Sequence, residues 1–157
     1  MLSSYLACPC EGHLKNALHV MGYLQLKHNS QLIFDPTYPD MDQNAFPSYD
    51  WTEFYRNVEE EICPNMPPPL GKDVALHMMV DSDHAGDKRT RHSCTGFIIF
   101  CNLAPMVWLS KQQATIETSV FGAEFVAMKH SIKTLRGLQY KIRMMGVPLS
   151  LSWSTYI

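Results

Sequence analysis

The hydrophobic pattern between residues 74 and 145 changes its period from two to about 3.6. In the first part, apolar side chains alternate with others at Val74, Leu76, Met78 and Val80. Such alternation predicts a β-strand whose two faces have different surroundings. In the last part, apolar residues recur at three- and four-residue steps between Ser119, a suitable N-cap, and the helix-ending pair Gly146 and Pro148. This spacing predicts a long helix that reaches about Met145.

Two further strands are predicted between the first strand and this helix. Residues 96–101 and 106–109 are apolar runs joined by a turn at 102–104, which is typical of a β-hairpin. Residues 149–157 predict the opening of another strand. The order of three strands, a helix and a strand predicts an α/β (mixed α+β) fold, with the helix packed across a three-stranded antiparallel sheet. The helix residues expected on its apolar stripe are Phe121, Phe125, Met128, Ile132, Leu135 and Ile142.

Upstream of the sheet the chain divides into two other segments. Residues 1–35 include one amphipathic helix, predicted over 10–27. Residues 36–72 form a connector, because seven of the ten prolines and the acidic run at 59–61 fall between residues 36 and 70. The connector also carries Phe46, Trp51, Phe54 and Tyr55. A solvated tether has no use for so much aromatic surface, so we expect an ordered arm. Residues 73–157 are the third segment.

Charge is unevenly divided along the chain. Residues 1–73 hold four Lys and Arg against ten Asp and Glu, a balance of 4 − 10 = −6, and residues 74–157 hold nine against five, a balance of 9 − 5 = +4. The second half is therefore the better candidate for binding a polyanion. The five cysteines include no C-x-x-C pair, which argues against a zinc knuckle or a disulfide framework. With no apolar stretch near 18 residues, we expect an intracellular chain without a membrane segment.

Two groups of carboxylates are the candidates for chemistry. Residues 81–87 read Asp-Ser-Asp-His-Ala-Gly-Asp directly after the first predicted strand. Carboxylates at a strand end suit Mg²⁺, which prefers oxygen ligands, although Asp and Gly are also ordinary turn formers. Glu124 lies at the edge of the apolar stripe of the long helix, and a carboxylate buried there would have to be paired or bind a metal. His84 is most simply a surface loop residue.

Four motifs, in order, resemble the ribonuclease H region of copia-type retrotransposon polyproteins. The family pattern is approximately D-A-D-x-A-G-D, S-x-S-G, W-x-S-K-x-Q and A-E-Y-x-A. Residues 81–87 match the first motif, and Cys-Thr-Gly at 94–96 stands in loosely for the second. Residues 108–113, Trp-Leu-Ser-Lys-Gln-Gln, match the third, and residues 123–127, Ala-Glu-Phe-Val-Ala, match the fourth. Residues 2–24 are similar to the stretch that follows the polymerase in these polyproteins.

The resemblance implies a ribonuclease H-like fold that hydrolyses the RNA strand of RNA:DNA hybrids with two Mg²⁺ (or Mn²⁺) ions. Asp81 and Glu124 would be the first two catalytic and metal-binding carboxylates. The implied partners are an RNA:DNA hybrid or duplex nucleic acid and the missing polymerase portion of the polyprotein. The basic residues that could hold phosphates are Lys88, Arg89, Arg91, Lys111, Lys129, Lys133 and Arg136.

The departures from the family lower the expected activity. The aromatic-x-D-D motif of the polymerase does not occur in this sequence. The third metal-binding Asp of the family follows the strand after the long helix, beyond Ile157, and Asp83 and Asp87 in the first loop are poorly placed to replace it. We therefore expect a ribonuclease H fragment with little or no cleavage. The alternatives are a catalytically silent nucleic-acid-binding or scaffold module, and a chain that does not fold without its missing parts.

Overall fold

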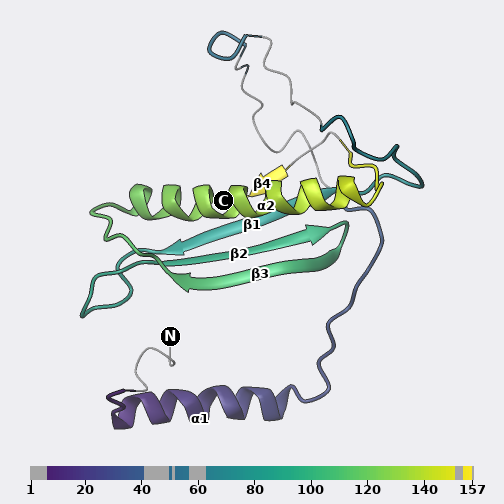
Figure 1. Ribbon diagram of the computed structural model, residues 1–157. Helices are drawn as coiled ribbons and strands as arrows, with labels where there is room; N and C mark the ends of the chain where they lie inside the picture. The colour runs from purple at the N-terminus through teal and green to yellow at the C-terminus, as the bar shows by residue number, and fades with distance from the viewer. Residues whose placement is uncertain (1–6, 41–49, 51, 57–62, 151–153, 157) are drawn as a thin grey trace. The chain divides into compact units, whose positions relative to one another are not determined.

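The computed structural model describes residues 7–40, 50, 52–56, 63–150 and 154–156. The chain forms two compact units, Met1–Ile33 and Phe34–Ile157. Figure 1 shows the elements, which in chain order are α1 (Glu11–Leu26), β1 (Leu76–Asp83), β2 (Cys94–Cys101), β3 (Ala104–Gln112), α2 (Val120–Met144) and β4 (Ser154–Tyr156). This is the mixed α+β composition that the sequence predicts. No helix within the described residues has the length and apolar character needed to cross a membrane.

Helix α1 is the regular element of the first unit. Its first turn is closed by the backbone N–H of Cys10, which donates to Nδ1 of His13 at 3.1 Å. Lys15 and Glu11 form a salt bridge of 2.8 Å one turn apart. None of the residues of α1 is buried. The predicted helix at 10–27 is confirmed, and packing within its own unit contributes little to it.

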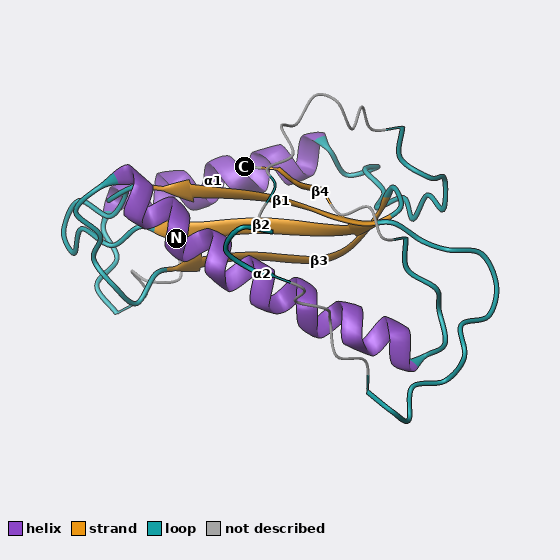
Figure 2. Cartoon of the chain, turned by 90° about the horizontal axis from the view of Figure 1, so that it is seen from above, coloured by secondary structure: helices purple, strands orange, loops and turns teal. Residues whose placement is uncertain are grey.

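The second unit contains a sheet with the strand order β3-β2-β1-β4. Strand β2 is antiparallel to both β1 and β3, and β4 runs parallel to β1, with Ser154 opposite His77. Figure 2 shows β1, β2 and β3 side by side along their length. The hairpin turn between β2 and β3 contains Asn102 at φ 54°, a left-handed conformation that Asn tolerates better than most residues. The predicted antiparallel sheet is confirmed, and the predicted last strand pairs with β1.

Helix α2 covers one face of the sheet and closes the core. Its N-cap is Ser119, whose Oγ accepts from the N–H of Gly122 at 3.0 Å, and Gly146 follows its end at φ 75°, as the sequence predicts. The core that α2 closes over β1 and β2 comprises Leu76, Met78, Val80, Phe97, Ile99, Ala127, Leu135 and Ile142. Alternate residues of β1 therefore face α2, and the residues between them face the other way.

The predicted sheet-facing stripe of α2 is partly wrong. Phe121, Phe125 and Ile132 are 75%, 52% and 38% exposed. The buried residues are instead Ala123, Ala127, Ser131, Leu135, Gln139 and Ile142. Small side chains in the first half of the helix let its backbone approach the sheet closely, and the bulky side chains lie on the outer face. Hydrophobicity alone does not reveal a face made of alanine and serine.

Both ends of the connector form hydrogen bonds with the rest of the second unit. Asn102 Nδ2 donates to the carbonyl of Pro36 at 2.9 Å, and the Tyr38 hydroxyl donates to Ser150 Oγ at 3.0 Å. Near the other end of the connector, the N–H of Leu70 donates to the carbonyl of Gly146 at 2.8 Å. These contacts agree with an ordered arm at both ends. The aromatic residues Phe46 and Trp51 and the acidic run at 59–61 lie outside the described residues, and Phe54 and Tyr55 are exposed.

Candidate functional site

Asp81 lies near the end of β1, on the central part of the sheet. It is paired with Gly96 of β2 and is exposed. Its neighbour Val80 belongs to the core that α2 covers. Because side chains alternate along a strand, Asp81 shares the opposite face with Met79, which is also exposed. The sequence motif therefore places a solvated carboxylate at the sheet surface.

Glu124 lies in the first turns of α2, between the buried residues Ala123 and Ala127. Its own side chain is exposed. The expectation that burial forces this carboxylate to be paired or to bind a metal is therefore wrong, because water can solvate it. Position 124 lies on the flank of the buried face of α2. The pairing of Asp81 with Glu124 as metal ligands stays a prediction.

Among the residues that the structure describes, no group of three or more His, Cys, Asp or Glu side chains is gathered closely enough to hold a metal ion. A divalent ion at Asp81 or Glu124 would therefore take part of its coordination from water or from a phosphate of the substrate. Mg²⁺ is commonly held in this way, by one or two carboxylates and a bound phosphate.

The carboxylate of Asp87 accepts hydrogen bonds from residues of its own loop and from β3. Its carboxylate accepts from the Thr90 hydroxyl at 2.6 Å, from the Arg89 N–H at 3.0 Å and from Gln112 Nε2 at 3.2 Å. The hydrogen bond from the Thr90 side chain, followed by that from the Arg89 backbone, lowers the pKa of Asp87 to about 2. Asp87 therefore acts as a turn former, which is the second of the two roles that the sequence allows for the residues of the 81–87 motif. Asp83, by contrast, is the last residue of β1 and pairs with Cys94, so its expected position in the loop is wrong.

His84 connects the loop after β1 to the segment before α2. It is half-buried, and its Nε2 donates to the carbonyl of Glu117 at 3.1 Å. The N–H of Ala85 donates to the buried Ser93 Oγ at 3.0 Å and holds the loop from its other side. The expected surface-loop assignment thus misses a bridging role for His84. Only a structure shows this, because Glu117 is 33 residues away along the chain.

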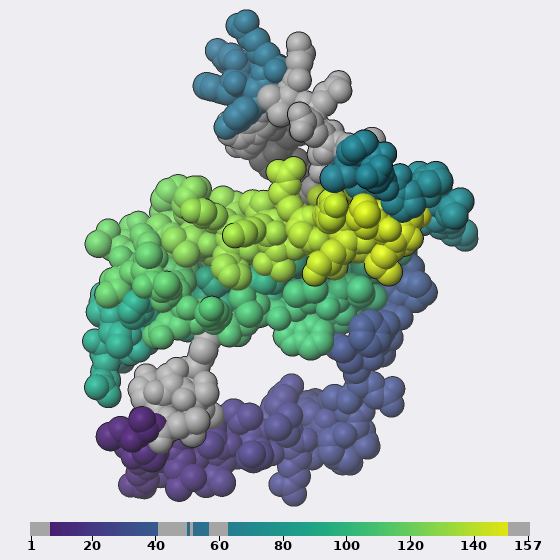
Figure 3. Space-filling view, in the orientation of Figure 1, coloured from purple at the N-terminus to yellow at the C-terminus, as the bar shows by residue number. Residues whose placement is uncertain are grey.

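The predicted basic residues fall into three places. Lys88, Arg89 and Arg91 are exposed in the loop between β1 and β2. Lys111, in β3, and Lys129, in α2, line one pocket of about 310 Å³. The outer face of α2, seen at the surface in Figure 3, carries a groove of about 460 Å³. This groove is lined by Phe125, Met128, Lys129, Ile132, Lys133 and Arg136.

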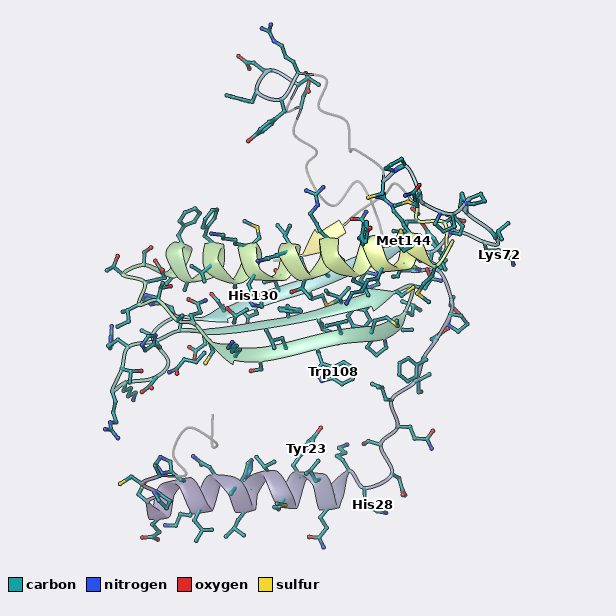
Figure 4. All side chains as sticks on the ribbon, viewed as in Figure 1. Tyr23, His28, Lys72, Trp108, His130 and Met144 are labelled. Atoms are coloured by element: carbon teal, nitrogen blue, oxygen red, sulfur yellow. The ribbon has the colours of Figure 1, made fainter. Side chains whose placement is uncertain are left out.

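The pocket shared by Lys111 and Lys129 contains residues that sequence reasoning missed. His130 lines it from α2, and its ring lies 6.0 Å from that of Phe97 between ring centroids; Figure 4 labels His130 on the helix above the sheet. Gln113 and Thr95 also line the pocket, and Gln113 Nε2 donates to Thr95 Oγ1 at 3.1 Å. The third motif contains Gln113, but its pattern does not say that the side chain turns towards α2.

Comparison with known proteins gives a distant relation to retrotransposon polyproteins. The chain is 29% identical over 80 residues to the "Retrovirus-related Pol polyprotein from transposon RE2" and 28% identical over 80 residues to that from transposon RE1, both of Arabidopsis thaliana. Each match covers 51% of this chain and 6% of the relative, so the chain spans a small part of these polyproteins. No protein-family model matches the chain, and no solved structure matches it.

Proposed function

We propose that the second unit is a ribonuclease H-like domain of a copia-type retrotransposon Pol polyprotein and that it binds RNA:DNA hybrids or duplex nucleic acid. The observation that carries the proposal is the sheet order β3-β2-β1-β4, with α2 connecting antiparallel β3 to β4, which is parallel to β1. The resemblance assigns the two metal-binding carboxylates to Asp81, a residue of β1, and to Glu124, a residue of α2. The relation to Pol polyproteins supports it independently.

The binding chemistry rests on the basic residues of the second unit. Lys111 and Lys129 line the same pocket, and the loop 84–93 presents three further cations, Lys88, Arg89 and Arg91. Positive side chains that replace counterions on phosphates give an affinity that falls steeply with salt. The polymerase portion of the polyprotein is the proposed protein partner.

The test is fluorescence anisotropy of the full chain with an 18-base-pair RNA:DNA hybrid, over about 50 to 200 mM salt. We expect a linear fall of log K with log salt. Combined Lys111→Gln and Lys129→Gln should reduce both affinity and slope, and Lys141→Gln, which removes the same charge from the last turn of α2, should change them less. Absence of binding, or binding that ignores salt, would contradict the proposal.

Metal-dependent cleavage is a second candidate, favoured by the exposure of both carboxylates to an approaching phosphate. Asp81 and Glu124 would each offer Mg²⁺ or Mn²⁺ a carboxylate oxygen, the ligand type that these ions prefer. Because Asp81 lies on the sheet face opposite the one that α2 covers, water and the substrate phosphate would have to supply the rest of the coordination. The ion, when bound, would activate water and stabilise the leaving oxygen. Residues of this chain would orient the phosphate, and none of them would form a covalent bond with it.

Cleavage is tested on a hybrid with end-labelled RNA in Mg²⁺ and in Mn²⁺. Loss of product in both Asp81→Asn and Glu124→Gln, with product retained in Asp73→Asn, would support the enzyme. Binding of the hybrid without any product would support the silent binding module instead. Product that survives both substitutions would show that other residues, or a contaminating nuclease, are responsible.

A further inference from the structure

The outer face of α2 carries an apolar strip and a basic strip side by side. Residues three and four apart share one face of a helix. The apolar strip consists of Phe121, Phe125, Met128 and Ile132. The basic strip consists of Lys129, Lys133 and Arg136. All of these residues except Phe121 line the groove of about 460 Å³.

The apolar strip offers its side chains to solvent instead of to the core. Phe121, Phe125 and Ile132 are exposed, and Met128 is half-buried. The rings of Phe121 and Phe125 stack on each other, with 6.3 Å between their centroids. Contiguous apolar surface of this kind is costly to hydrate and commonly marks a site of protein interaction.

The basic strip determines the charge of the partner. Among the residues that the structure describes, no Asp or Glu lines the groove. Neither Lys129 nor Lys133 forms a salt bridge within the described part of the chain. Cations spaced by four and by three residues form one edge of the groove, so carboxylates at the same spacing on a partner helix would face them. Charge complementarity therefore selects an acidic partner.

The form of the two strips favours a helix over a nucleic acid strand. They extend from residue 121 to residue 136, which is about 22 Å along the axis of α2. A partner helix of about four turns matches this length, and amphipathic helices bind apolar grooves in this way. Phosphates would neutralise the lysines but would leave Met128 and Ile132 in water.

We propose that the outer face of α2 binds an acidic amphipathic helix of a partner protein. Aliphatic side chains of the partner fill the groove along the apolar strip, and its Asp and Glu residues pair with the basic strip. This interaction goes beyond the proposed function, because it requires neither nucleic acid nor the carboxylates of Asp81 and Glu124.

The experiment is fluorescence anisotropy of the full chain with a labelled peptide of about four helical turns. The peptide carries leucines at every third or fourth position and glutamates beside them. One control peptide has lysine in place of each glutamate, and the other has serine in place of each leucine. Both controls should bind at least about tenfold more weakly, because the first loses the ion pairs and the second loses the apolar contact. No binding of the acidic peptide, or equal binding of all three, would overturn the proposal.

Variants of exposed residues locate the binding. Phe125→Ala should weaken the acidic peptide by about tenfold or more. Lys133→Gln should weaken it by about twofold to fivefold, because one exposed ion pair is lost. Lys141→Gln removes the same charge from the last turn of α2 outside the groove and should leave the affinity unchanged. An equal loss in Lys141→Gln would mean general charge attraction and would refute the site.

The same measurements distinguish the other occupants. Single-stranded RNA that binds more tightly than the acidic peptide, and loses this affinity in Phe125→Ala, would assign the groove to nucleic acid and overturn the proposal. Peptide binding that appears only after residues 59–61 are changed from Glu to Gln would identify the acidic run of this chain as the occupant and would also overturn it. Loss of peptide binding in Phe125→Ala with hybrid binding unchanged would support the proposal and separate it from the proposed function.

Discussion

His77 is the residue at which burial and titration conflict most directly. It is 5% exposed and stacks on Phe100 at 4.9 Å, with 5° between the rings. Its Nδ1 has no partner among the described residues, and burial lowers its pKa from 6.5. The neutral imidazole is therefore the form that the fold accommodates.

A dependence of stability on pH follows from His77. Below pH 6.5 the unfolded chain takes up a proton that the folded chain refuses, so this residue makes stability fall as the pH drops from 6.5 to its lower folded-state pKa. Thermal unfolding between pH 7.5 and pH 5 measures the effect. His77→Phe should flatten the profile, and His19→Gln, in exposed α1, should leave it unchanged. A profile as steep in His77→Phe as in the native chain would contradict this origin.

Asp87 gives the opposite case, a carboxylate that the fold prefers charged. The hydrogen bond from the Thr90 hydroxyl is the largest cause that lowers its pKa to about 2. The contribution of Asp87 to the free energy of unfolding is therefore complete above the ordinary pKa of 3.8 and is lost as the pH falls through about 2. Asp87→Ala should therefore speed amide hydrogen exchange at Arg89, whose N–H the carboxylate binds at 3.0 Å. Lys88→Ala is the matched loop control, and equal exchange in both variants would refute the role.

At the scale of elements, the first half of α2 has small residues against the sheet and bulky residues on its exposed face. Ala127→Leu should destabilise the protein by about 1 to 3 kcal/mol, because the added atoms have no room in the core. Phe125→Ala, on the exposed face, should change stability by about 0.5 kcal/mol or less. Urea unfolding measures both. The reverse ranking would show that α2 packs through its phenylalanines.

The same helix marks how far sequence reasoning reaches. Its existence and both ends could be predicted, because Ser119 and Gly146 are local signals. Its orientation could not, since Ala127 and Ser131 are chosen by their closeness to the sheet and not by hydrophobicity. Likewise, the motifs supplied Asp81 and Glu124 and the basic residues, but the joining of Lys111 with Lys129 and His130 depends on how α2 crosses β3. Long-range packing of this kind leaves no local pattern.

At the scale of the whole molecule, the hydrophobic core belongs to one unit. All of its buried members lie between Leu76 and Ile142, and none of the residues of α1 is buried. A chain of residues 34–157 should therefore unfold cooperatively on its own, as followed by circular dichroism at increasing temperature. A broad, non-cooperative transition would instead favour the alternative that the chain needs missing parts to fold.

The pairing of β4 with β1 has a consequence for the order in which the sheet assembles. Ser154 lies opposite His77, 77 positions away along the chain, whereas β2 and β3 are joined by a tight turn at Asn102. Closing a long loop is entropically slower than forming a hairpin. The β2–β3 hairpin is therefore expected to form early, and the parallel edge strand to join last, after the crossover helix is in place.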